Sequence, residues 1–182
     1  MAQRIETRQW VPHPVELVFA FFANPSNLPH LMPPAQKTRI EDVRLQPPPQ
    51  RPWTPDPSRR FRSIAAGKGS EILISFCPVP WLPKRVGWLA RVVDFKWNSH
   101  FADEQVRGPF HQFHHRHGIV AEVRDWVEGT LVTDEIEFSL PGAAIGGLAA
   151  GVVRGQLEKA FAYRQKRLPE ILATAARQAV QR

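Results

Sequence analysis

The hydrophobic period of the chain changes once, at Pro141-Gly142, and this change constrains the fold more than any other feature. Before it, apolar residues alternate along short segments, which predicts strands at 37–45, 71–76, 85–98, 101–106, 110–124 and 130–140. After it, apolar residues from Ile145 to Leu172 recur near multiples of 3.6, which is typical of one long amphipathic helix. A curved antiparallel sheet must cover its apolar face, and only this helix is long enough to do so.

Two short helices are expected between a first strand at 6–10 and the rest of the sheet. Pro14 suits the first turn of a helix over 14–23, in which apolar residues follow the helical period. The Asn-Pro-Ser sequence at 24–26 ends this helix, and a second one is predicted over 26–31.

We expect residues 1–182 to form one domain. Proline and glycine mark the irregular segments within it. Residues 46–60 hold six prolines, which fix φ and remove hydrogen-bond donors, so a loop excursion is predicted there. Glu128-Gly129 is predicted as the turn before the last strand. Pro169 is predicted to kink or end the last helix, which should begin near Ala144.

Composition narrows the class of protein. No apolar run approaches the roughly 18–20 residues that cross a bilayer, and the first ten residues lack a secretory pattern, so a cytoplasmic protein is expected. Cys77 is the only cysteine and has no partner for an internal disulfide.

The net charge of +7 raises the question of nucleic acid or anionic membrane as a partner. The basic residues are scattered, however, and no nucleic-acid-binding motif accompanies them. We therefore interpret them as a solvated surface, including the cluster near the C-terminus that comprises Arg154, Lys159, Arg164, Lys166 and Arg167.

Four stretches resemble the START/Bet v 1-like superfamily, in particular bacterial ligand-binding SRPBCC (polyketide cyclase/dehydrase-like) domains. They are PWLPKRVGW (80–88), FADEQVRGPFHQFHHRH (101–117), TLVTDEIEFSLPGAAIGGLA (130–149) and FAYRQKRL (161–168). The resemblance implies an α+β helix-grip fold, in which a curved antiparallel β-sheet wraps around a long C-terminal α-helix. It also implies a cavity that binds a hydrophobic small molecule such as a lipid, a polyketide or an aromatic compound. Members of the superfamily divide between carriers, sensors and enzymes.

Alternation separates the four histidines of the stretch 111–117. His115 and His117 share the apolar face of their strand with Phe113, so they should point into the protein, whereas His114 should face solvent. The same pattern places Asp134 among apolar neighbours on the inner face of the last strand. A buried carboxylate needs a partner, and His115 or His117 on the adjacent strand is the natural one.

Three roles compete for this cluster. Two inward histidines could bind a metal, but no third ligand stands out, so no metal and no cofactor are expected. A His–Asp acid–base pair would suit a cyclase- or dehydratase-type lyase or isomerase, with His115, His117 and Asp134 as catalytic candidates. The third role, the polar wall of a ligand cavity in a carrier or sensor, is the one we favour.

Each expected ligand-binding residue either faces inward by alternation or lies in a stretch that resembles the family. Either register of 101–106 is open, and the bulk of Phe101 favours the one that turns it inward. The candidates are Trp88, Phe101, Asp103, Gln105, Phe113, His115, His117, Asp134 and Phe138. The expected partner is a hydrophobic small molecule bound by a monomer or homodimer, with no specific nucleic acid and no transmembrane segment.

Overall fold

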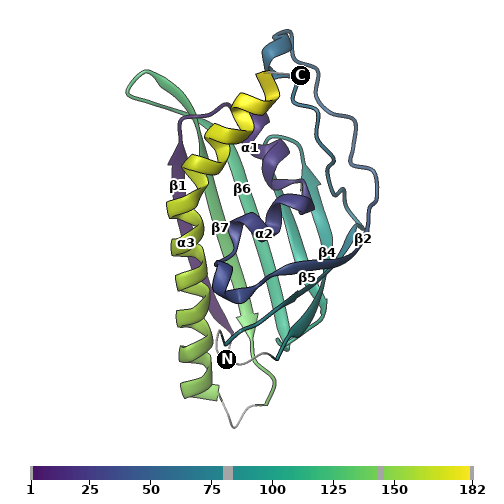
Figure 1. Cartoon of the computed structure of the whole chain (residues 1–182), viewed down its shortest axis with the longest axis vertical. Coiled ribbons are helices and arrows are strands. Elements are labelled where there is room, and N and C mark those ends of the chain that lie inside the picture. Colours follow the sequence, from purple (N-terminus) through teal and green to yellow (C-terminus); the bar gives the residue numbers. More distant parts are fainter. Residues whose placement is uncertain (1, 80–83, 143–145, 181–182) are drawn as a thin grey trace.

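The computed structural model describes residues 2–79, 84–142 and 146–180, with side chains of the last segment placed from 150 to 177. All described strands form one antiparallel sheet in the order β1-β7-β6-β5-β4-β3-β2 (Figure 1). In chain order the elements are β1 (Gln3–Val11), α1 (Val15–Phe22), η1 (Pro25–Asn27), α2 (Leu28–Leu31), η2 (Pro34–Gln36), β2 (Arg39–Arg44), η3 (Pro57–Arg59), β3 (Glu71–Phe76), β4 (Val86–Lys96), β5 (His100–Arg107), β6 (Gln112–Arg124), β7 (Val127–Ser139) and α3 (Gly146–Val180).

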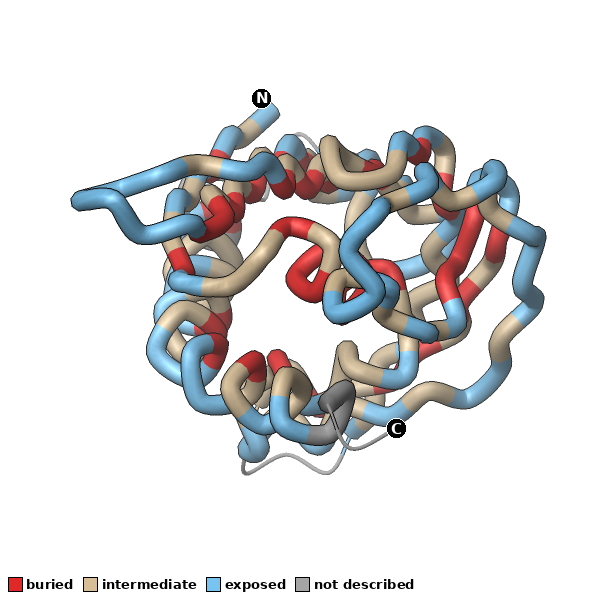
Figure 2. The backbone as a smooth tube through the Cα atoms, turned by 90° about the horizontal axis from the view of Figure 1, so that it is seen from above, coloured by how far each residue is buried: buried red, intermediate tan, exposed pale blue. Residues whose placement is uncertain are grey.

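The sheet curves around the interior, and α3 runs along one side of it while α1 and α2 lie in front of the central strands (Figure 1). Viewed from above, the backbone forms a ring around the interior (Figure 2). The predicted α+β helix-grip fold is confirmed. The predicted start of the helix near Ala144 lies outside the described residues. No described helix combines the length and apolar character that a membrane span requires.

Two apolar clusters attach α3 to the rest of the molecule. Leu168 and Leu172 are fully buried against a cluster that includes Val18 and Phe19 of α1. Leu157 and Phe161, about three turns earlier, pack against a second cluster made by Ile5, Phe113, Ile136 and Phe138 of the sheet. These four residues of α3 are spaced four, seven and four apart, so they lie on one face of the helix. Any side chain that lies on this face of α3 between the two clusters therefore points at the sheet.

Of the two predicted outcomes for Pro169, a kink or an end of the helix, the end is wrong: α3 continues through the proline, because a side chain from β1 bonds the carbonyl that proline leaves free. A proline within a helix removes the bond to the carbonyl four residues earlier, here that of Gln165. Gln9 Nε2 donates to this carbonyl oxygen at 2.8 Å, and Gln165 Nε2 donates to the Arg8 carbonyl at 3.1 Å. The helix therefore continues to Val180.

The hairpin between β6 and β7 turns at Asp125-Trp126, so the predicted turn at Glu128-Gly129 is wrong. Both residues of the turn have positive φ (47° and 64°), as tight two-residue hairpin turns require. Gly129 lies within β7 and serves close packing instead. A Cβ at this position would lie 2.3 Å from the Trp10 ring and 2.6 Å from the Val11 carbonyl oxygen.

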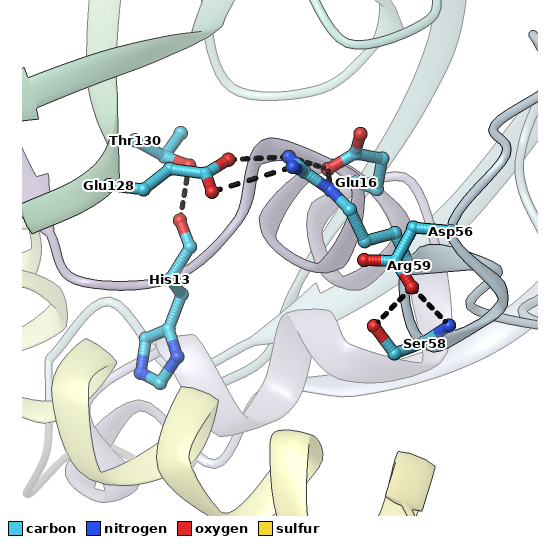
Figure 3. A network of polar contacts seen from close by, with 7 residues as sticks. All are labelled: His13, Glu16, Asp56, Ser58, Arg59, Glu128 and Thr130. Carbon is cyan, nitrogen blue, oxygen red and sulfur yellow. Dashed lines mark hydrogen bonds and ion pairs between the residues drawn. The ribbon is translucent and has the colours of Figure 1, made fainter.

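The proline-rich connection between β2 and β3 is fastened to the sheet by Arg59 (Figure 3). Its guanidinium pairs with Glu16 of α1 at 2.8 Å and with Glu128 of β7 at 2.5 Å. Asp56 caps the short η3 helix by accepting from the Ser58 backbone N–H at 2.9 Å. One arginine thus joins a loop, a helix and a strand at one end of the molecule.

Two valine-to-alanine variants test the burial of α1. Val18 is fully buried, whereas Val152 of α3 is 63% exposed. Val18→Ala should lower the free energy of unfolding by about 2 kcal/mol or more, since two methyl groups leave the core and a cavity remains. Val152→Ala brings the same gain in helix propensity as Val18→Ala but removes no buried methyl groups, so it should leave the free energy of unfolding unchanged or raise it slightly. Urea unfolding measures both, and equal effects would contradict the packing of α1 described here.

Candidate functional site

The site is built around Asp134, a carboxylate on the inner face of β7 that is only 2% exposed. One carboxylate oxygen, Oδ2, accepts from Thr7 Oγ1 at 3.2 Å and from the guanidinium of Arg164 on α3. The other oxygen, Oδ1, lies 3.0 Å from Nε2 of His115 on β6. Strands on both sides of β7 and the long helix therefore all supply a partner to the same buried charge, which offsets the cost of removing it from water.

His115 and His117 lie side by side on the inner face of β6, as alternation predicts. Both are buried, and their ring centroids are 3.8 Å apart. Phe101 of β5 stacks on the His117 ring at 4.3 Å with an interplanar angle of 24°. The rings are thus held by aromatic contact as well as by Asp134, which fixes their orientation.

His117 lies between two carboxylates and has a hydrogen-bonding atom without a partner. Its Nδ1 is 2.9 Å from Asp134 Oδ1, which is within ion-pair distance, but the two atoms do not have hydrogen-bond geometry. Among the described residues, this buried nitrogen has no hydrogen-bond partner. Nε2, on the other side of the ring, is 3.7 Å from Asp103 Oδ2.

Burial keeps both imidazoles neutral at pH 7. Removal from water lowers the pKa of His115 well below the ordinary value of 6.5, and the neighbouring His117 lowers it further. Burial also lowers the pKa of His117, although Asp103 opposes this effect. A neutral imidazole can both donate and accept a hydrogen bond, and it can act as a base or bind a metal ion.

Arg164 is the residue of the site that the sequence reading missed, because it was interpreted as part of a solvated basic surface. It is buried, and burial lowers the pKa of its guanidinium to about 9. Besides bonding Asp134, it lies over the ring of Phe161 at 4.5 Å and that of Phe22 at 5.5 Å. Its spacing could have revealed it, since Arg164 lies three residues after Phe161 and four before Leu168 on the buried face of α3.

A cavity of about 200 Å³ opens next to these polar groups, between the sheet, α1, α2 and α3. Most of its wall is apolar, with Asp103, His115, His117 and Arg164 gathered among aliphatic and aromatic side chains. Further lining residues include Phe22, Leu31, Ile72, Ile74, Trp88, Ala90, Val92, Phe101, Phe113, Leu157, Ala160 and Phe161.

The structure brings six of the nine expected ligand-binding residues to the cavity wall: Trp88, Phe101, Asp103, Phe113, His115 and His117. Asp134 lies behind the two histidines and contacts them. Gln105 instead closes the β5–β6 turn, where its amide bonds the backbone N–H and carbonyl of Phe110. Phe138 is buried in the apolar cluster beneath α3. Alternation in β3 and β4 could also have identified Ile72, Ile74 and Val92.

One group of side chains has the composition of a metal site. Asp103, His115 and His117 each offer one ligand atom, and these three atoms lie within 4.8 Å of one another. All three residues line the cavity.

Comparison with known proteins supports the fold. Residues 11–163 match the family described as polyketide cyclase / dehydrase and lipid transport. No curated protein sequence matches the chain. Solved structures that resemble it include the Zhui aromatase/cyclase from Streptomyces sp. R1128 (15% identity, TM-score 0.63, 98% of this chain and 96% of that one). The fold is also similar to that of TTHA0849 from Thermus thermophilus (18% identity, TM-score 0.58, 95% of this chain and 99% of that one). A third similar structure is the major latex-like protein 151 of Panax ginseng (11% identity, TM-score 0.56, 91% of this chain and 97% of that one).

The lowered pKa values predict a stability that falls in mild acid. Below pH 6.5 the unfolded chain takes up protons that the buried imidazoles do not, so the free energy of unfolding decreases as the pH drops. Between pH 7.5 and 5.5 the loss should be about 1.4 kcal/mol for a histidine that stays neutral throughout when folded. His115→Asn should remove about this much of the pH dependence in urea unfolding with EDTA present. An unchanged pH dependence in His115→Asn would contradict the neutral, buried state of this ring.

Proposed function

The chain belongs to the polyketide cyclase/dehydrase and lipid transport family, within the START/Bet v 1-like superfamily, and we propose that it carries or senses a small apolar molecule with an oxygen-bearing group. The molecule occupies the cavity between the sheet and α3. Its apolar body contacts the aliphatic and aromatic wall, and its oxygen is held by the polar groups beside Asp134.

The observation that carries this proposal is a group of polar side chains gathered in a largely apolar cavity wall. Asp103, His115, His117 and Arg164 all line the cavity. Trp88, on the same wall, has a buried Nε1 without a hydrogen-bond partner in the described part of the chain. An apolar cavity with a few convergent polar groups is typical of a small-molecule site, and a buried polar atom without a partner favours a ligand or water that completes its hydrogen bond.

The volume of the cavity limits the size of the ligand. About 200 Å³ is below the range of roughly 300–1,000 Å³ that is usual for drug-sized ligands. It corresponds to roughly seven water molecules at about 30 Å³ each. A one- or two-ring compound such as a phenol, a naphthol or a short polyketide fits this space better than a long-chain lipid.

A second candidate function is proton transfer on the bound molecule, and the bond between His115 and Asp134 favours it. A carboxylate that orients a neutral imidazole is the arrangement of a general base. Arg164 is close enough to stabilise an enolate or alkoxide oxygen in the same cavity. The chemistry would be that of a cyclase or dehydratase.

Two alanines of α3 provide a matched test of where the ligand binds. Ala160 is buried and lines the cavity, whereas Ala162 is exposed on the other face of the helix. Ala160→Phe should fill the cavity and weaken binding of 2-naphthol, a two-ring phenol, by more than tenfold, while Ala162→Phe should bind like the wild type. Isothermal titration calorimetry measures the affinity, and circular dichroism confirms that both variants are folded.

Equal binding by a folded Ala160→Phe variant would contradict ligand binding in this cavity. Native mass spectrometry of the purified protein adds a second readout, since a co-purifying compound should be present in the wild type and absent from Ala160→Phe. Carrier and enzyme differ in what happens next. Conversion of that compound by the wild type but not by His115→Asn would establish proton transfer, and recovery of unchanged compound supports the carrier.

A further inference from the structure

We propose that Asp103, His115 and His117 form a binding site for a divalent transition-metal ion of the Zn²⁺ type. The sequence indicated two inward histidines but no third ligand, and the fold provides it in Asp103. Two imidazoles and one carboxylate are a ligand set that zinc and non-haem iron use in proteins. The inference goes beyond ligand binding and does not depend on which molecule occupies the cavity.

The distances suit one shared ion. Zinc binds nitrogen and oxygen ligands at about 2.0–2.2 Å, so two tetrahedral ligands of one ion lie about 3.3 Å apart. His117 Nε2 and Asp103 Oδ2 are 3.7 Å apart, and the three ligand atoms of the group lie within 4.8 Å. Small side-chain rotations therefore suffice to bring all three into coordination.

Adjacent strands hold the three ligands in place. Asp103 of β5 is directly opposite His115 of β6 in the antiparallel register, and His117 is two residues further along the same face. Sites built on strands keep their geometry better than sites built on loops. Phe101, which is opposite His117, adds its stacked ring to the support.

Asp134 occupies the position of an outer carboxylate behind the ligating imidazoles. Metal-binding histidines almost always bond a second group through the other ring nitrogen, which orients the ring. His115 uses Nε2 for its bond to Asp134, and the structure shows no hydrogen bond from Nδ1 to another described residue. His117 has Nδ1 on the side of Asp134 and Nε2 on the side of Asp103. Asp134 therefore orients the His115 ring through a hydrogen bond and lies within ion-pair distance of the outer nitrogen of His117.

The charges around the group permit a cation. Arg164 opposes a metal ion, but its guanidinium is bonded to Asp134 through Oδ2, whereas the histidines face Oδ1. The positive charge of Arg164 and the negative charge of Asp134 therefore offset each other. Asp103 remains as the carboxylate that can neutralise part of the ion's charge.

The cavity gives such an ion an open position. Asp103, His115 and His117 all line it, so a fourth ligand would come from the cavity side. This ligand would be water or an oxygen atom of the bound molecule. Three protein ligands and one exchangeable position are typical of zinc sites that act on or hold a ligand rather than stabilise a fold.

Titration with the metal alone tests the site. The protein, freed of a histidine tag and dialysed against EDTA and then buffer, should bind one Zn²⁺ in isothermal titration calorimetry. Co²⁺ should give the strong visible absorption of a four-coordinate site. Asp103→Asn, His115→Gln and His117→Gln should each weaken binding by at least ~10-fold, and Asp134→Asn by about 10–100-fold through the loss of orientation.

Two histidines outside the cavity lining provide the controls. His114→Gln changes the neighbour that faces away from the cavity, and His100→Gln removes the imidazole that pairs with Asp94 at 3.0 Å. Both variants should bind Zn²⁺ like the wild type. Asp103 is partly exposed, so Asp103→Asn should fold even if a histidine variant does not. Absence of one-to-one binding in the wild type, or unchanged binding in folded Asp103→Asn, would overturn the proposal.

Discussion

A single buried carboxylate, that of Asp134, joins three parts of this molecule. Thr7 on β1, His115 on β6 and Arg164 on α3 all bond it. A charge in this position is tolerable only while its partners remain, because an unpaired buried ion costs several kcal/mol. The positions of the two histidines, the seating of α3 and the polar end of the cavity all depend on this arrangement.

The cavity follows from how α3 is attached. Two apolar clusters fasten the helix at Leu157 and Phe161 and again at Leu168 and Leu172, and Arg164 reaches the sheet between them. The curved sheet does not contact the helix uniformly, so space is left beside the guanidinium. Fixed polar groups at the edge of an apolar space hold an oxygen-bearing ligand in one orientation, and they also permit proton transfer or metal binding.

Much of this could be predicted from the sequence, because the strands and the last helix differ in hydrophobic period. Alternation identified His115, His117 and Asp134 as inward-facing residues. It missed Arg164, since a charged residue on a helix is usually exposed and its buried position depends on packing. The turn at Asp125-Trp126 was missed because Gly129 resembles a turn residue, whereas the ring of Trp10 is what requires a glycine there. The continuation of α3 through Pro169 could not be predicted, because the bond that compensates for the proline comes from Gln9, a residue distant in sequence.

Asp134 and Arg164 form an interdependent buried pair. A double-mutant cycle in urea unfolding, with Asp134→Asn, Arg164→Met and the double variant, tests this interdependence most directly. Each single variant should lower the free energy of unfolding by about 3–5 kcal/mol, because it leaves an uncompensated buried group. The double variant should lose less than the sum by about 2 kcal/mol or more. The adjacent pair Arg4–Glu135 is exposed, with a separation of 3.1 Å, and the same cycle there should give a coupling below about 1 kcal/mol. Additive losses at Asp134 and Arg164, within about 0.5 kcal/mol, would contradict the account.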